Sequence, residues 1–188
     1  MVLMSLNEAQ RQQLLELAKA SVKCGLQTGK PLKIKLADYP RELQAHRATF
    51  VTLHLNHQLR GCTGVLYVIR PLVEDIVENA YSAAFKDSRF PPLAAHEFED
   101  LEIHLSLLTS AEPMSFTSEQ DLVSQLQPGV DGLVLKEGNM RGTFLPSVWE
   151  TLPKPEQFLR HLKQKAGLPP DFWSDTILIY CYRSEYIS

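Results

Sequence analysis

Several features that would point directly to a function are missing from this sequence of 188 residues. Basic residues do not exceed acidic ones, because 19 Lys and Arg stand against 22 Asp and Glu, a formal net charge of −3. Proteins that bind nucleic acid usually carry a basic surface, so we predict no nucleic-acid partner. No apolar run approaches the 18 or more residues that a membrane-spanning helix needs, so we predict no membrane span either.

Cysteine is scarce. The three cysteines, Cys24, Cys62 and Cys181, lie far apart in the sequence. An odd and sparse set is typical of a reducing compartment and not of a disulfide framework. The first ten residues contain no basic residue ahead of a short apolar stretch, so they do not resemble a secretory signal. We therefore expect a cytoplasmic protein, and the sequence predicts no particular oligomeric state.

The sequence also lacks the motifs of the best-known catalytic, cofactor and metal sites. It contains no HExxH, no CxxC, no Walker lysine loop, no GxSxG and no GxGxxG. A catalytic zinc ion usually needs three protein ligands. His54 and His57 flank a turn, but three positions apart on an extended chain they would point to opposite faces. We predict no metal ion and no cofactor.

The spacing of apolar residues predicts the fold. Ser5 and Glu8 fit a capping box at the start of a helix that Gly25 or Gly29 can end. Further helices are predicted after Pro71, Ser118 and Pro155, and strands at 49–55, 58–66, 101–107, 133–135, 140–145 and 177–182. Hairpins join most of the strands. This pattern predicts an α+β fold with a mainly antiparallel sheet and flanking helices, in a single domain over residues 1–188 with two lobes.

Two short segments suggest an internal duplication of a hairpin-helix unit. Leu59-Arg60-Gly61 and Met140-Arg141-Gly142 each follow a polar turn, lie on the returning strand of a hairpin and precede a helical pattern. The two segments are 140 − 59 = 81 positions apart. An apolar residue followed by Arg-Gly is common, so a chance match explains the similarity equally well.

The segment at 59–64, Leu-Arg-Gly-Cys-Thr-Gly, is the most unusual in the chain. Strict alternation along a strand would place Arg60 and Cys62 on the same face, where a guanidinium group would favour the nucleophilic thiolate. Gly61 and Gly64 are typical of a bulge or of close approach by a ligand or another backbone. The alternative is that Cys62 is a small buried residue and that both glycines relieve crowding.

A second candidate segment is Lys-Asp-Ser-Arg-Phe-Pro-Pro-Leu at 86–93. Phe90 precedes a proline and is therefore biased to an extended conformation, and Pro91-Pro92 stiffens the chain after it. A rigid loop that presents Asp87 and Arg89 is typical of a binding site. In the alternative, these two residues cap helix ends or pair with each other, and Phe90 fills the core.

These segments resemble the AMMECR domain family. Residues 59–64 are similar to the family signature LRGCIG, and residues 84–93 are similar to its block F-x-D-P-R-F-P-P-L. Blocks at 105–109, 132–135, 143–146 and 165–168 match in the same order. The chain departs from the pattern at Thr63, where the family has Ile, and at Ser88, where it has Pro. Both departures leave the polar and aromatic motif residues in place.

The resemblance implies an α+β fold in which the 59–64 segment lies near a cleft between two lobes. It also implies association, in prokaryotes, with a Memo-like protein and a radical SAM enzyme, as in the AmmeMemoRadiSam system, but it supplies no reaction. We therefore expect an accessory protein that binds through Arg60, Gly61, Gly64, Asp87, Arg89 and Phe90. The alternative is a thiol-dependent enzyme in which Cys62 attacks a small molecule or peptide, with His54 or His104 as base.

The absence of a metal-ligand motif gives a direct test. We expect the purified protein to contain less than about 0.1 equivalent of zinc, iron or copper, because fewer than the three ligands of an ordinary catalytic site are predicted to converge. Elemental analysis of the native protein measures this, and a stoichiometric metal would contradict it.

Overall fold

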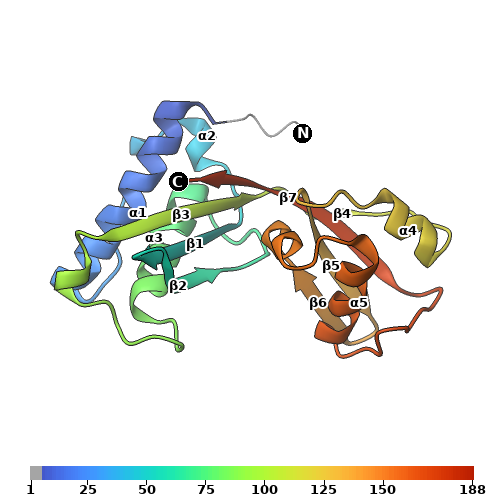
Figure 1. The fold of residues 1–188 in the computed structure, drawn as a ribbon. Coiled ribbons are helices and arrows are strands. Elements are labelled where there is room, and N and C mark those ends of the chain that lie inside the picture. The colour runs from blue at the N-terminus through green and yellow to red at the C-terminus, as the bar shows by residue number, and fades with distance from the viewer. Residues whose placement is uncertain (1–5) are drawn as a thin grey trace. The chain divides into compact units, whose positions relative to one another are not determined.

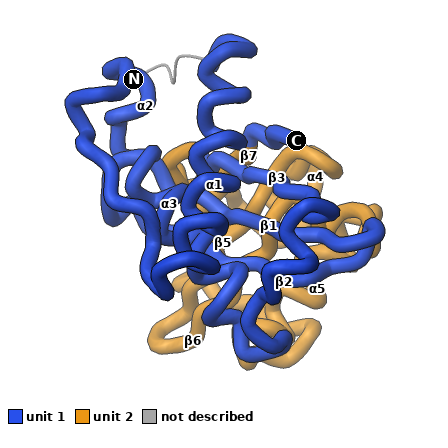
Figure 2. Tube along the Cα trace, turned by 90° about the vertical axis from the view of Figure 1, so that its left-hand side faces the viewer, with its two compact units in different colours: residues 1–108, 185–188 blue, residues 109–184 orange. Residues whose placement is uncertain are grey.

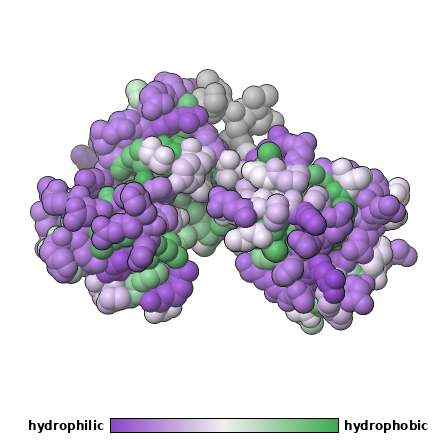
Figure 3. Space-filling model, in the orientation of Figure 1, coloured by the Kyte–Doolittle hydropathy of each residue, from purple (hydrophilic) through white to green (hydrophobic). Residues whose placement is uncertain are grey.

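The structure, a computed structural model, describes residues 6–188. The chain divides into two compact units: unit 1 comprises residues 1–108 and 185–188, and unit 2 comprises residues 109–184 (Figure 2). Each unit has its own hydrophobic core. On the face that Figure 3 shows, both units expose mostly hydrophilic residues and some smaller hydrophobic areas. The assignment of residues 1–188 to a single domain stays a prediction.

Unit 1 packs helices against one side of a sheet (Figure 1). Its strands are β1 (Thr49–Leu55), β2 (Gln58–Gly64) and β3 (Leu101–Leu108), and β1 pairs antiparallel with both others. The helices are α1 (Glu8–Thr28), α2 (Arg41–Gln44) and α3 (Leu72–Phe85). Apolar side chains of α1, α3, β1 and β3 form the core, among them Leu14, Ile76, Val51 and Leu105, all fully buried.

The first helix begins differently from the prediction. The Asn7 side chain accepts a hydrogen bond from the Gln10 amide at 2.8 Å, and the Gln10 side chain accepts one from the Asn7 amide at 3.0 Å. Asn7 and Gln10 therefore form the capping box, and the helix begins at Glu8. Ser5, the predicted cap, lies outside the described residues. Gly29 ends the helix in the left-handed conformation, with φ of 69°.

Unit 2 contains two helices and most of four strands. The strands are β4 (Glu112–Pro113), β5 (Asp131–Glu137), β6 (Met140–Phe144) and β7 (Leu178–Ile187), the last of which ends in unit 1. The helices are α4 (Glu119–Gln125) and α5 (Pro155–Lys165). Trp149 stacks on Phe158 in the core with ring centroids 3.8 Å apart. Lys163 is fully buried, and its ammonium group lies 2.5 Å from Glu119, which links α5 to α4.

The strands follow the order β2-β1-β3-β7-β5-β6, with β4 paired to β7. These strands pair antiparallel: β1 with β2 and β3, β7 with β4 and β5, and β5 with β6. The predicted α+β fold with a mainly antiparallel sheet is confirmed. Within residues 6–188, no helix is long and apolar enough to cross a membrane.

The second unit repeats the element order of the first. In each unit a hairpin is followed by a helix and then by a strand that pairs with the first strand of the hairpin: β1-β2-α3-β3 and β5-β6-α5-β7. A Cβ atom at Gly61 would lie 2.1 Å from the Ala83 carbonyl oxygen in α3, and one at Gly142 would lie 2.9 Å from the Leu162 carbonyl oxygen in α5. Both glycines thus allow the last turns of a helix to approach the returning strand. This shared topology favours duplication over a chance match.

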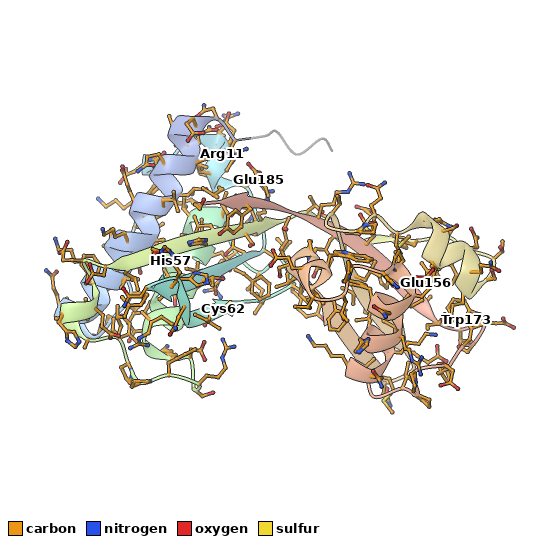
Figure 4. The ribbon with its side chains drawn as sticks, in the orientation of Figure 1. Arg11, His57, Cys62, Glu156, Trp173 and Glu185 are labelled. Carbon is orange, nitrogen blue, oxygen red and sulfur yellow. The ribbon has the colours of Figure 1, made fainter. Side chains whose placement is uncertain are left out.

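The end of β7 is anchored in unit 1 by Glu185. Arg47 is buried, donates to the Leu107 and Leu108 carbonyl oxygens at 3.2 and 3.1 Å, and pairs with Glu185 at 3.2 Å. Arg11, from α1, lies 2.8 Å from the other Glu185 oxygen (Figure 4). A buried guanidinium group needs such partners, because its charge is costly to remove from water.

The two arginines that share Glu185 give a matched comparison. We expect Arg47→Met to lower the free energy of unfolding by about 3 kcal/mol, because it leaves two buried carbonyl groups without their side-chain donor and removes one of the two ion pairs of Glu185. Arg11→Met removes a partly exposed pair and should cost at most about 1 kcal/mol. Urea unfolding measures both values, and equal losses would contradict the assignment of Arg47 as the main anchor.

Candidate functional site

The LRGCTG segment forms β2, and it contains a β-bulge. Leu53 pairs with Gly61 but the next residue, His54, pairs with Leu59, so Arg60 has no partner on β1. The bulge that the glycine predicted is present. The bulge interrupts strict alternation next to Arg60, and a shared face for Arg60 and Cys62 stays a prediction.

Arg60 is engaged by the segment that follows the second motif. Its Nε and Nη2 donate to the two carboxylate oxygens of Glu97 at 2.8 and 2.9 Å, and its Nη1 donates to the Pro91 carbonyl oxygen at 3.0 Å. The Arg60 side chain is only 11% exposed. This bidentate pair lowers the pKa of Glu97 to about 2. Arg60 therefore fastens residues 91–97 to β2.

Asp87 links the two motifs directly. Its Oδ2 accepts the Cys62 amide at 2.9 Å and Arg89 Nη2 at 2.7 Å, while its Oδ1 accepts Arg89 Nε at 3.0 Å. The Asp87 side chain is 7% exposed, whereas that of Arg89 is 56% exposed. The Arg89 guanidinium group holds the pKa of Asp87 well below its usual range. The alternative in which Asp87 and Arg89 pair with each other is thus what the structure shows.

The bond from Cys62 to Asp87 also protects the edge of the sheet. β2 is the first strand of the order, so the outward N–H groups of this strand have no neighbouring strand to bond. Unpaired groups of this kind are a template for aggregation, and proteins often cover them with a loop. Asp87 gives the Cys62 amide an acceptor at the point where α3 leads into the 86–93 loop.

Gly61 faces α3, and the side chain of the next residue, Cys62, points to the other face of β2. It faces Thr52 in the register of β1, and the Sγ to Oγ1 distance is 3.4 Å. Cys62 is half-buried and is not part of a disulfide, as is also true of Cys24 and Cys181. Burial, together with the neighbouring Asp131, raises the pKa of the Cys181 thiol to about 12.

The two candidate bases lie on the same sheet as the thiol. Thr52 pairs with Cys62 on one side and with His104 on the other, so His104 is two strands from Cys62, roughly 9.5 Å by ordinary strand spacing. His54 lies two residues along β1 and packs against His104, with ring centroids 4.7 Å apart. The fold brings the two histidines together, and the close side-chain contact of the thiol is with Thr52.

The glycines of the first motif are required by close packing. A Cβ atom at Gly61 would overlap the α3 backbone, and one at Gly64 would lie 2.3 Å from the Thr49 carbonyl oxygen and 2.4 Å from the Phe50 ring. The reading in which both glycines relieve crowding accounts for these contacts. Their part in binding stays a prediction.

Phe90 lies between the two arginines of the site. The guanidinium carbons of Arg60 and Arg89 are 6.0 and 5.5 Å from the centroid of its ring, and the ring is half-buried. Cations over an aromatic face are attracted to its π-electrons. The exposed residues of this loop are Lys86, Ser88, Arg89, Pro91 and Pro92. Residues 59–64 and 86–97 thus form one connected surface, which we call the two-motif surface.

Glu97 is the functional-site residue that sequence reasoning missed. It lies 37 positions from its partner Arg60 and outside both motifs. No local spacing predicts such a pair. In the part of the chain that the structure describes, no group of three His, Cys, Asp or Glu side chains is placed to hold a metal ion.

The fold and the two-motif surface define the class of protein. The AMMECR1 family model matches residues 15–187, so the chain belongs to the AMMECR1 family. A protein of Methanothermobacter thermautotrophicus is 35% identical over 178 residues, which cover 92% of this chain and 90% of the relative. Protein MJ0810 of Methanocaldococcus jannaschii is 37% identical over 161 residues, covering 81% and 78%.

A solved structure has the same fold. The crystal structure of the uncharacterized protein PH0010 from Pyrococcus horikoshii matches with a TM-score of 0.85 and 32% sequence identity. The match covers 96% of this chain and 92% of that one.

The Asp87 bond can be tested at a single amide. Asp87→Ala should speed hydrogen exchange at the Cys62 amide at least tenfold, because a partly buried bond to a carboxylate contributes about 1.5 to 3 kcal/mol. Asp100→Ala, at an exposed aspartate of unit 1, is the control. Because the pKa of Asp87 is lowered, its stabilisation is present above the ordinary aspartate pKa of about 3.9 and is lost only as the pH falls further. Exchange that is unaltered in Asp87→Ala would contradict the bridge.

Proposed function

We propose that this protein is a non-catalytic accessory protein that binds a radical SAM enzyme and a Memo-like protein through the two-motif surface. Membership of the AMMECR1 family supports the proposal, since the resemblance implies association with such partners. The observation that carries it is the position of Asp87, whose carboxylate holds the Cys62 amide and the Arg89 guanidinium group at once.

The main charged side chains of the two-motif surface form hydrogen bonds and ion pairs with one another. Arg60 is bonded to Glu97 and Pro91, and Asp87 is bonded to Arg89 and Cys62. A substrate would have to displace one of these pairs before it could use the same donors. A partner that contacts the outer side of the surface meets groups that are already ordered, so less conformational entropy is lost on binding.

The exposed part of the surface has the composition of a protein interface. Arg89 is more than half exposed, Phe90 is half-buried beneath it, and Pro91 and Pro92 follow in an exposed, stiffened segment. Arginine and aromatic side chains are enriched at the centres of interfaces, where they carry most of the binding energy. Arg89 and Phe90 are therefore the expected anchors.

The partial exposure of Cys62 favours the second candidate, a thiol-dependent enzyme. Cys62 is half-buried and not fully enclosed, and its thiol lies 3.4 Å from the Thr52 hydroxyl. In this alternative Cys62 acts on a small molecule or peptide. Activation of the thiol would require a base close to Cys62, and His104 lies two strands away from it.

Binding assays with purified components separate the two candidates. We expect Arg89→Ala and Phe90→Ala each to weaken binding to the radical SAM or the Memo-like protein of the same organism at least tenfold, because each removes an anchor. Arg41→Ala, at an exposed arginine of α2, should bind like the wild type. Cys62→Ser should also bind normally. Calorimetry with the full chain gives the affinities.

Two results would count against the accessory role. Unchanged affinity in Arg89→Ala and Phe90→Ala would place any interface elsewhere. The second result concerns Cys62→Ser. If this variant binds its partners normally but, unlike the other variants, fails to restore growth or product formation in a deletion strain, the protein is a thiol-dependent enzyme.

A further inference from the structure

A group of titratable side chains in unit 1 takes no part in the two-motif surface. It comprises His54 on β1, Glu102 and His104 on β3, and Tyr186 near the end of β7. We propose that His104, packed against His54, is a pH-sensitive latch for the last residues of β7, closed when its ring is neutral and open when it takes up a proton. The proposal does not depend on the proposed function.

The contacts of His104 explain why the latch acts on β7. His104 Nδ1 forms a hydrogen bond with the Tyr186 hydroxyl, and the two rings meet edge to face with centroids 5.5 Å apart. The Tyr186 side chain is otherwise largely exposed, at 55% of its full area. The imidazole is therefore the group that holds this tyrosine against the sheet.

The second histidine makes protonation unfavourable. The His54 and His104 rings lie 4.7 Å apart at the centroids, so two positive charges there would repel each other. His54 Nδ1 is buried and has no hydrogen-bond partner among residues 6–188.

The other charged and titratable groups around the pair do not remove this penalty. Glu102 Oε2 lies 3.9 Å from His104 Nε2, but its Oε1 lies 3.2 Å from Nδ1 of the exposed His57. One carboxylate is thus shared between two imidazoles and cannot neutralise a third. On the β2 side, Cys62 lies opposite Thr52, and Leu59, opposite His54, precedes Arg60. The Arg60 guanidinium group is bonded to Glu97 and Pro91.

The sign of the pH dependence follows from these contacts. Burial and the neighbouring His54 lower the pKa of His104. A histidine with a lowered pKa in the closed state takes up its proton more readily when the contact opens. Closure is therefore most stable above the ordinary histidine pKa of about 6.5 and weakens as the pH falls below it.

The change should be confined to the end of the strand. Glu185 pairs with Arg47 and Arg11, which take no part in the histidine contacts, so these two pairs hold the strand on the other side of Tyr186. The residues of β7 from Leu178 to Arg183 pair with β5 in unit 2. Opening thus frees Tyr186 and loosens its neighbour Ile187.

Hydrogen exchange of the full chain at pH 7.5 and pH 5.5 tests the latch. After correction for intrinsic exchange rates, the Tyr186 and Ile187 amides should lose protection at least fivefold at the lower pH, while the Val51 amide of β1 should not change. His104→Gln should abolish the pH dependence. His161→Gln, at an exposed histidine of α5, should retain it. Tyr186→Phe, which keeps both rings but lacks the hydroxyl, should show low protection at both pH values.

Three results would overturn the proposal. The first is equal protection of the wild-type strand end at the two pH values. The second is a pH response that persists unchanged in His104→Gln. The third is a uniform loss of protection across unit 1, which would show general destabilisation by acid in place of a local latch.

Discussion

The carboxylate of Asp87 is the group on which the candidate site depends. Its two oxygens bond a backbone amide in β2 and a guanidinium group in the 86–93 loop, so one side chain fixes the distance between two motifs 25 positions apart. Gly61 makes this possible, because only a residue without Cβ lets α3 approach β2 closely enough to bring Asp87 to the strand edge. Arg60 and Glu97 then fasten the far end of the loop.

The two units share a scaffold, but the Asp87 bridge of the candidate site is formed in unit 1. Both have a hairpin, a helix and a third strand in the same order, and Gly61 and Gly142 play the same packing part in each. The position that corresponds to Cys62 in unit 2 is Thr143, 81 residues further along. The duplicated part is therefore the packing of a helix on a hairpin. The polar bridge belongs to unit 1.

The sequence predicted the features that depend on local patterns. Alternation marked β1 and β3, helical spacing marked α3 and α5, and the glycines marked the bulge and the helix contact. It could not predict that the bulge falls at Arg60, because an extra residue leaves no local trace, nor that Arg60 pairs with Glu97, which is brought near only by the tertiary fold. Asn7 was missed as the cap of α1 because Ser5 with Glu8 and Asn7 with Gln10 have the same spacing, and both pairs fit a helix start.

We propose that residues 59–64 and 86–97 act as one binding surface. The most direct test is hydrogen exchange of the intact chain, free and saturated with the purified radical SAM enzyme or Memo-like protein. We expect added protection in both segments together, because Asp87 couples them, and little change in β5 and β6 of unit 2. Protection in neither segment, or in one without the other, would contradict it.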